Sequence, residues 1–251
     1  MILIIARREF GGFALTPFGP VLLAFCQLLL AYLFLSYVDS FLGRQAELAA
    51  LPNSPGATQW VVTQWLAIAS IVMLAALPLI TMKSFSDEWR GGTMSLLLSA
   101  PASSLQIVLG KFIGILAVIG LIVATAALMP ISLHLGTTAD FGLIAAAMLG
   151  LFLLLMAFAA IGLYMSSLTR QPSTAAFSTF GILLLLWLLE WTVTDDITGS
   201  RAVFAYVSLF RHFQPFIQGQ IVVADVMYFV LVCALFLGLT VRRLEAQRRF
   251  D

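Results

Sequence analysis

Charged residues are scarce in this chain. Asp, Glu, Lys and Arg make up only 10% of its 251 residues, whereas 61% are hydrophobic, and the mean hydropathy is +1.04. Soluble domains carry about 25% charged residues, so a soluble protein is excluded. We predict an all-α, polytopic membrane protein that forms one transmembrane domain over residues 1–251.

Cysteine and histidine are equally sparse, with two residues of each type. Cys26 and Cys233 lie inside apolar runs, where a thiol behaves as a small hydrophobic side chain, and they give no indication of a disulfide. His134 and His212 lack the paired spacing of a zinc site, so we expect no metal ligands.

Catalytic motifs are also missing. There is no phosphate-binding G-x-x-x-x-G-K-[ST] loop, because Gly110-Lys111 has Leu105 five positions before the glycine and Phe112 after the lysine. The H-E-x-x-H motif and the G-x-S-x-G motif are absent as well. We therefore expect that the chain does not hydrolyse ATP by itself, and an enzyme is the weaker hypothesis.

Long apolar runs, by contrast, are plentiful. A helix needs about 20 apolar residues to cross a bilayer. Six runs qualify: Phe18–Val38, Val61–Met82, Ile107–Pro130, Phe141–Met165, Thr174–Trp191 and Val222–Val241. Pro17 and Pro172 suit helix starts, and six spans place both termini on one side of the membrane.

The basic residues predict the orientation of these spans. Ten of the thirteen lie on the side of the termini: Arg7, Arg8, Lys83, Arg90, Lys111, Arg170, Arg242, Arg243, Arg248 and Arg249. Arg44, Arg201 and Arg211 fall on the other side. Short loops rich in Lys and Arg stay in the cytoplasm, so both termini are predicted to be cytoplasmic.

Residues 1–16 carry apolar side chains at helical spacing, with Arg7, Arg8 and Glu9 between them. This pattern predicts a helix that lies in the inner interface of the membrane. The alternative is a charged flank that only orients the first span.

One compact polar insert, Lys83–Lys111, separates the second and third spans. We predict a short helix that begins near Ser84, with Ser84 or Ser86 as its N-cap and acids in its first turn, and that ends at Gly91-Gly92. Lys111 is predicted to anchor the third span at the interface.

Within this insert, EWRGGTMSLLLSAPASSLQIVLGK resembles the pattern of type-2 ABC exporter permeases. The stretches RREFGGFALTPFGPVLLAF, GLYMSSLTRQPSTAAFSTF and HFQPFIQGQIVVADVMYFVLVCALFLGLTVRRLEAQRR are similar to other parts of the same family. The likeness covers nearly all of the chain. It most resembles the gliding-motility-associated branch, with the nitrous-oxide-reductase-maturation permeases as relatives.

This resemblance implies a permease in a bacterial cytoplasmic membrane that pairs with a second copy, or with a homologous permease, and binds two ATPase subunits. ATP and Mg would be held by those subunits, and no nucleic acid is expected as a partner. The implied coupling region is 83–106, with a second contact at Ser166–Pro172. The implied contact residues are Phe85, Asp87, Glu88, Trp89, Arg90 and Arg170.

On the outer side, the resemblance implies short re-entrant helices over residues 195–220 and a possible auxiliary protein. Glu190 lies beside Trp187 and Trp191, which favours interface depth over a buried functional acid. Arg211 and His212 are interpreted as lipid headgroup contacts or helix caps. For Glu88, the alternative to coupling is a helix cap or a solvated charge.

Small residues recur at four-residue spacing in Gly110/Gly114 and Gly142/Ala146/Gly150, which favours close packing within one bundle over subunit contacts. The spans hold few ionisable groups, so lipid-like or amphipathic cargo, or force transmission without cargo, fits better than an ion. A secondary transporter and a non-transporting scaffold remain as alternative functions.

Overall fold

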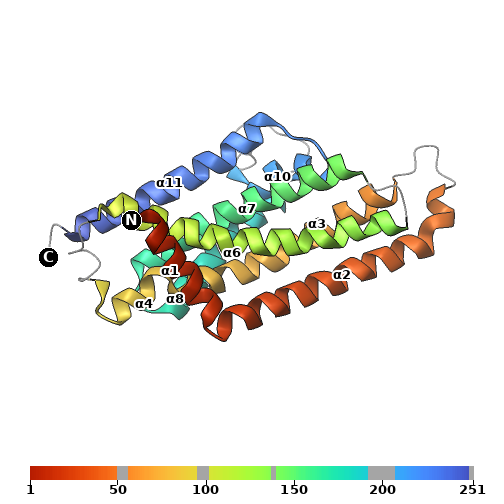
Figure 1. Ribbon diagram of the computed structural model, residues 1–251. Helices are drawn as coiled ribbons and strands as arrows, with labels where there is room; N and C mark the ends of the chain where they lie inside the picture. The colour runs from red at the N-terminus through yellow and green to blue at the C-terminus, as the bar shows by residue number, and fades with distance from the viewer. Residues whose placement is uncertain (50–55, 95–101, 137–139, 192–206, 249–251) are drawn as a thin grey trace.

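The computed structural model describes residues 1–49, 56–94, 102–136, 140–191 and 207–248, and all regular structure in these ranges is helical (Figure 1). The elements are α1 (Ile2–Leu15), α2 (Phe18–Ala49), α3 (Ala57–Thr81), α4 (Lys83–Arg90), α6 (Ser104–Ser132), η1 (Leu133–Leu135), α7 (Phe141–Leu168), α8 (Pro172–Trp191), α10 (Leu209–Ile217) and α11 (Val223–Arg248). Within the described residues, six helices are long and apolar enough to cross a membrane: α2, α3 with α4, α6, α7, α8 and α11. The predicted set of six spans is therefore confirmed.

The helix starts follow local sequence signals. Pro172 is the first residue of α8, and α2 begins directly after Pro17, as predicted. Helix α6 begins three residues earlier than expected, at Ser104, because Ser103 and Gln106 form a capping box. The Ser103 Oγ accepts from the Gln106 backbone N–H, and the Gln106 side chain accepts from the Ser103 backbone N–H.

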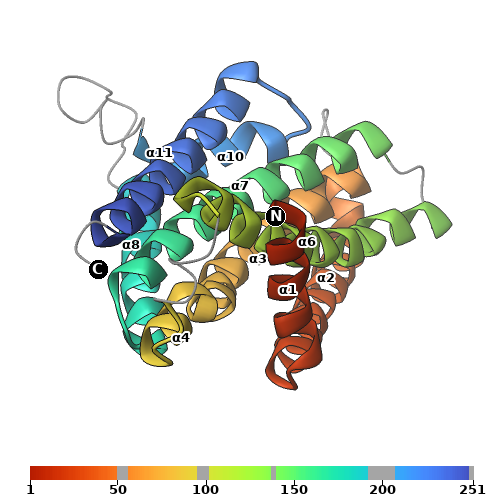
Figure 2. The same cartoon turned by 60° about the vertical axis from the view of Figure 1, so that its left-hand side comes forward.

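Helix α7 forms the centre of the bundle (Figures 1 and 2). It packs against α3, α6, α8 and α11, and side chains such as Leu154, Phe158 and Ile161 are completely buried. Helices α2, α8 and α11 lie at the periphery, and many of their large apolar side chains are exposed. Lipid is about as apolar as leucine, so this exposure suits a membrane environment.

Close packing of α1 against α6 depends on two glycines. A Cβ at Gly110 would lie 2.7 Å from the Ile5 Cβ, and one at Gly114 would lie 2.7 Å from the Glu9 Cβ. A Cβ at Gly150 would similarly collide with Phe216 of α10. These small residues therefore mediate packing within one bundle, as predicted, while the interfacial position of α1 stays a prediction.

The start of α1 and the end of α11 lie at the same end of the bundle as α4 (Figure 1). An even number of spans produces this arrangement, and it brings together α1, α4 and the start of α8. The side of the membrane on which this end lies stays a prediction from the basic residues.

Candidate functional site

Helix α4 is a direct continuation of α3. Met82, the residue between them, has helical backbone angles, and its N–H donates to the Pro78 carbonyl at 2.9 Å. Helix α4 itself begins at Lys83, within one residue of the predicted start near Ser84, but the predicted N-cap is wrong. Ser84 and Ser86 are buried inside α4 rather than capping it, and the first turn contains no acid. The helical backbone continues from α3 through Met82 into α4.

The predicted end of α4 is confirmed. The Gly91 N–H donates to the Asp87 carbonyl at 2.8 Å, and Gly92 has a φ of 67°. This left-handed conformation favours glycine, which explains why the helix stops at the Gly-Gly pair. Of the predicted coupling region 83–106, residues 95–101 lie outside the described residues.

The inner face of α4 is fixed to α7 by one serine. The Ser166 Oγ accepts hydrogen bonds from the backbone N–H groups of Phe85, at 3.0 Å, and Ser86, at 3.1 Å. It also donates to the Met82 carbonyl at 3.0 Å. The Phe85 side chain is completely buried beside this contact. Phe85 thus packs in the interior, and its side chain is not on the surface that a partner would meet.

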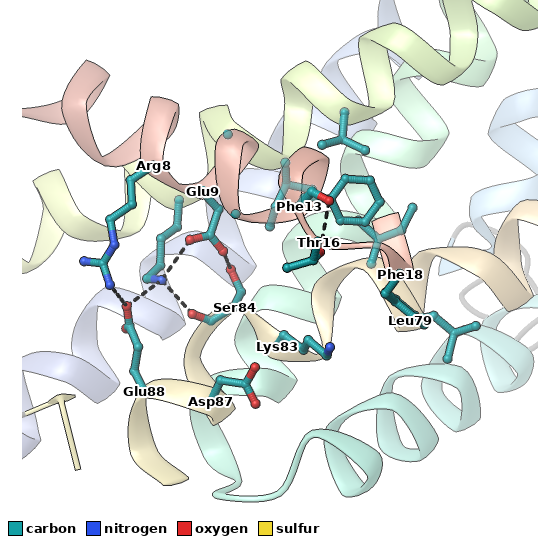
Figure 3. Close-up of a pocket in the computed structure, with 16 residues that line it drawn as sticks. Arg8, Glu9, Phe13, Thr16, Phe18, Leu79, Lys83, Ser84, Asp87 and Glu88 are labelled. Atoms are coloured by element: carbon teal, nitrogen blue, oxygen red, sulfur yellow. Dashed lines mark hydrogen bonds and ion pairs between the residues drawn. The ribbon is translucent and has the colours of Figure 1, made fainter. Parts of the chain in front are cut away.

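A buried lysine joins α4 to α1 and α6. The Lys111 side chain is only 3% exposed, and its Nζ lies 3.0 Å from the Glu88 Oε1 and 3.1 Å from the Glu9 Oε2. The same Nζ donates to the Ser84 carbonyl at 2.6 Å (Figure 3). The predicted role of Lys111 as an interface anchor is therefore wrong, because its ammonium group is held inside the protein.

Glu9 and Arg8 complete this cluster from α1. The Ser84 Oγ donates to the Glu9 Oε1 at 2.5 Å, and the Arg8 Nη2 lies 4.0 Å from the Glu88 Oε1 (Figure 3). Two carboxylates thus share one buried ammonium group, and Arg8 adds a second, largely exposed cation. The cluster Glu9, Glu88 and Lys111, called the ion cluster below, links three helices.

The outer face of α4 is open. Asp87 and Arg90 are exposed, and Trp89 is half-buried. The Arg170 guanidinium, from the turn between α7 and α8, lies 6.0 Å from the centroid of the Trp89 ring. The six predicted coupling residues therefore divide into two groups: Phe85 and Glu88 face inward, whereas Asp87, Trp89, Arg90 and Arg170 reach the surface.

A second short helix, α10, lies in the segment predicted to re-enter from the outer side. Its aromatic residues Phe210, Phe213 and Phe216 are buried, and Ser208 is its N-cap. Residues 195–206 of this predicted loop lie outside the described residues, as does the side chain of Glu190.

His212 of α10 is buried, so the interpretation as a headgroup contact or helix cap is wrong. Its Nδ1 lies 2.6 Å from the Asp225 Oδ1 at the start of α11, and its ring stacks on Tyr228 at a centroid distance of 3.9 Å. Arg211 is exposed, and its headgroup role stays a prediction. Sequence reasoning missed the His212–Asp225 pair because no short motif joins the two positions.

Two polar side chains inside the spans donate hydrogen bonds within the bundle, although the buried Gln27 Oε1 has no partner among the described residues. The Gln27 Nε2 donates to the Thr125 Oγ1 at 2.6 Å and to the Ile122 carbonyl at 2.9 Å, which joins α2 to α6. The Thr179 Oγ1 donates to the Ala175 carbonyl within its own helix. Among the described residues, no group of three His, Cys, Asp or Glu side chains could hold a metal ion.

Comparison with known families agrees with this architecture. The model described as ABC-2 family transporter protein matches residues 23–248, which is most of the chain and includes all of α3 to α11. No curated protein matches the sequence. The chain belongs to the ABC-2 family of transporter proteins, as a membrane permease that has no ATPase activity of its own.

Proposed function

We propose that this permease is the membrane subunit of an ATP-driven exporter and that α4 is the element through which a separate ATPase subunit moves it. One observation carries the proposal. Helix α4 continues directly from span α3, is tied by its inner face to α1, α6 and α7, and presents polar side chains on its outer face. A displacement of α4 is thus transmitted to several spans at once.

The two faces of α4 imply a division of roles. Asp87, Trp89, Arg90 and Arg170 would contact the ATPase subunit, because they are accessible and lie on two adjacent segments. Phe85 and Glu88 would transmit the movement, because their contacts lead to the interior. The resemblance implies a coupling role for all six residues, and the geometry supports this division of roles between them.

In the proposed assembly, the permease pairs with a second copy or a homologous permease, and two ATPase subunits hold ATP and Mg. The exposed apolar faces of α2, α8 and α11 leave room for such pairing within the bilayer. The chain would lie in a bacterial cytoplasmic membrane with both termini in the cytoplasm. The common location of the start of α1, the end of α11 and α4, together with the ten basic residues assigned to that side, supports this orientation (Figure 1).

The proposed cargo is lipid-like or amphipathic, or force is transmitted to an auxiliary protein on the outer side. The scarcity of ionisable groups in the spans supports this choice, and so does the Gln27–Thr125 pair, which is turned toward its own bundle. The resemblance to the gliding-motility-associated branch favours force transmission. ATP-dependent flux of a small ion through the reconstituted complex would contradict this proposal for the cargo.

The test is co-purification of the chain with its ATPase, followed by reconstitution and measurement of ATP turnover. We expect Arg90→Glu to lower permease-stimulated turnover by about tenfold, because reversing an accessible interfacial charge opposes association. Arg211→Glu, an exposed reversal on α10, is the matched control and should leave turnover unchanged. A chain that purifies without an ATPase, or that tolerates Arg90→Glu, would contradict the proposal.

A further inference from the structure

A pocket of about 330 Å³ opens between α1, the α3–α4 junction and the first half of α6 (Figure 3). It lies where span α3 ends and span α2 begins, which corresponds to the predicted level of the lipid head groups in the leaflet on the α4 side. Its volume is near the lower end of the range for small-molecule sites, roughly 300–1,000 Å³. It could hold a head group and the first part of an acyl chain, but not a whole lipid.

The residues that line this pocket form a charged side and an apolar side. Its charged members are Arg8, Glu9, Lys83, Asp87, Glu88 and Lys111, and its apolar members are Phe13, Phe18, Leu79, Ile80, Ile115 and Val118. In Figure 3 the labelled carboxylates and Arg8 gather on one side, whereas Phe13, Phe18 and Leu79 gather on the other. A soluble ion would leave the apolar side unoccupied, so an amphipathic ligand fits better.

Most of the charges in the pocket are already compensated. The ammonium group of Lys111 is shared by Glu9 and Glu88, and Arg8 approaches Glu88. In the described part of the chain, Lys83 and Asp87 make no ion pair, although they lie one turn apart on α4. One exposed cation and one exposed anion therefore remain for a ligand.

The position of Lys83 points toward the apolar side. Its Nζ lies 4.8 Å from the centroid of the Phe18 ring. A long lysine side chain in this position packs its methylene groups on apolar surface and keeps its charge at the head-group level. An anion bound there would lie directly beside the apolar wall.

We propose that this pocket holds the head group of a phospholipid that carries a primary ammonium group, with ethanolamine as its chemical class. The lipid phosphate would bind Lys83, the ammonium group would donate to Asp87, and the adjoining acyl chain would lie along Phe13, Phe18 and Leu79. A quaternary choline cannot donate hydrogen bonds to Asp87, and a glycerol head group supplies no cation. The two exposed charges therefore select a zwitterionic lipid with N–H donors.

Asp87 is also among the residues assigned above to ATPase contact, so lipid binding is measured on the permease alone, without the ATPase. The full-length chain, purified in a neutral detergent, is titrated with dioleoyl phosphatidylethanolamine, phosphatidylcholine and phosphatidylglycerol, and the first bound lipid is counted by native mass spectrometry. We expect phosphatidylethanolamine to bind about fivefold more tightly than the other two, as for one additional charge-assisted hydrogen bond. Equal binding of the three lipids would overturn the proposal.

Charge variants test the two assigned contacts. Lys83→Gln should weaken the binding of both zwitterionic lipids, phosphatidylethanolamine and phosphatidylcholine. Asp87→Asn should remove the preference for phosphatidylethanolamine over phosphatidylcholine. Arg90→Gln, an exposed change on the same helix and outside the lining, should alter neither. No effect of Lys83→Gln and Asp87→Asn would contradict the assignment. Displacement of the lipid by millimolar inorganic phosphate would overturn it in favour of a simple anion site.

A pair of neighbouring glycines provides a test that leaves all charges in place. A Cβ at Gly11 or Gly12 would meet no atom within 4 Å, but only Gly12 lines the pocket. The Gly12→Leu side chain should fill the pocket and abolish selective binding of phosphatidylethanolamine. The Gly11→Leu variant should bind this lipid as tightly as the unaltered chain does. If the two variants behave alike, the pocket is not the lipid site.

Discussion

Two short helices, α4 and α10, pack against different parts of α7 by different kinds of contact. Helix α4 is held near Ser166 by hydrogen bonds and by the ion cluster. Helix α10 is held near Gly150 by three buried phenylalanines. Polar contacts have preferred directions and fix the orientation of a helix, whereas aromatic burial mainly fills space. The α4 contacts are thus the better suited to transmit a directed movement.

The largest expected effect comes from removing the central cation of the ion cluster. Lys111→Met would leave Glu9 and Glu88 close together in a buried site without their ammonium partner. We expect a loss of about 3–5 kcal/mol in the free energy of unfolding, measured by denaturant titration in detergent micelles.

A rescue variant serves as the control for this change. Adding Glu9→Gln and Glu88→Gln to Lys111→Met removes the uncompensated charges, so much of the lost stability should return. If the single and triple variants are equally unstable, packing of the lysine stem, and not its charge, holds α4 in place.

For a change in α10 we expect a smaller loss in the free energy of unfolding. Phe216→Ala removes a completely buried ring that packs on Gly150 and leaves a cavity. The expected cost is about 3 kcal/mol, with no change in coupled ATP turnover at saturating ATPase. Arg211→Ala, an exposed change on the same helix, is the control. Loss of turnover in a folded Phe216→Ala variant would show that α10 also belongs to the coupling machinery.

Removing the hydrogen-bonding serine of α7 should have an intermediate effect. Ser166→Ala leaves the N–H groups of Phe85 and Ser86 without their acceptor, at a cost of about 2 kcal/mol. The neighbour Ser167 is also buried, but among the described residues its Oγ bonds only the Tyr164 carbonyl of its own helix. Ser167→Ala should therefore cost clearly less in the same denaturant titration, and equal losses would contradict the bridging role of Ser166.

The smallest stability effect is expected at the surface. Arg170→Glu removes the contact with the Trp89 ring, which is worth about 0.5 kcal/mol at an exposed site. Coupled ATP turnover should nevertheless fall, though less than with Arg90→Glu, if this turn is a secondary contact. Arg170→Lys keeps the charge and should retain most of the turnover. Unchanged turnover in Arg170→Glu would remove this residue from the docking surface.

The sequence predicted those parts of the fold that depend on local chemistry. Apolar length determines the six spans, Pro172 begins α8, and Gly91-Gly92 ends α4. The capping box at Ser103 and Gln106 was also visible as an S-x-x-Q pattern, and it could have corrected the start of α6. These signals need only neighbouring residues.

The candidate site was less predictable, because its contacts are not local. Ser84 and Ser86 are good capping residues, but helix α3 continues through Met82 and buries both of them. The coupling role of Glu88 stays a prediction, and nothing near it in the sequence indicates that its partner is Lys111. Tertiary packing also decides that Phe85 faces inward while Asp87 faces outward.

The separation of Glu9 and Lys111 along the chain has a consequence for biosynthesis. The two residues are 102 positions apart, so the ribosome must add that many residues before the acid can meet its cation. At about 5–20 residues per second, this interval lasts roughly 5–20 s. During that time α1 can contact neither Lys111 nor the surface of α6 at Gly110 and Gly114. The packing site of α1 therefore forms only once the third span has entered the bilayer.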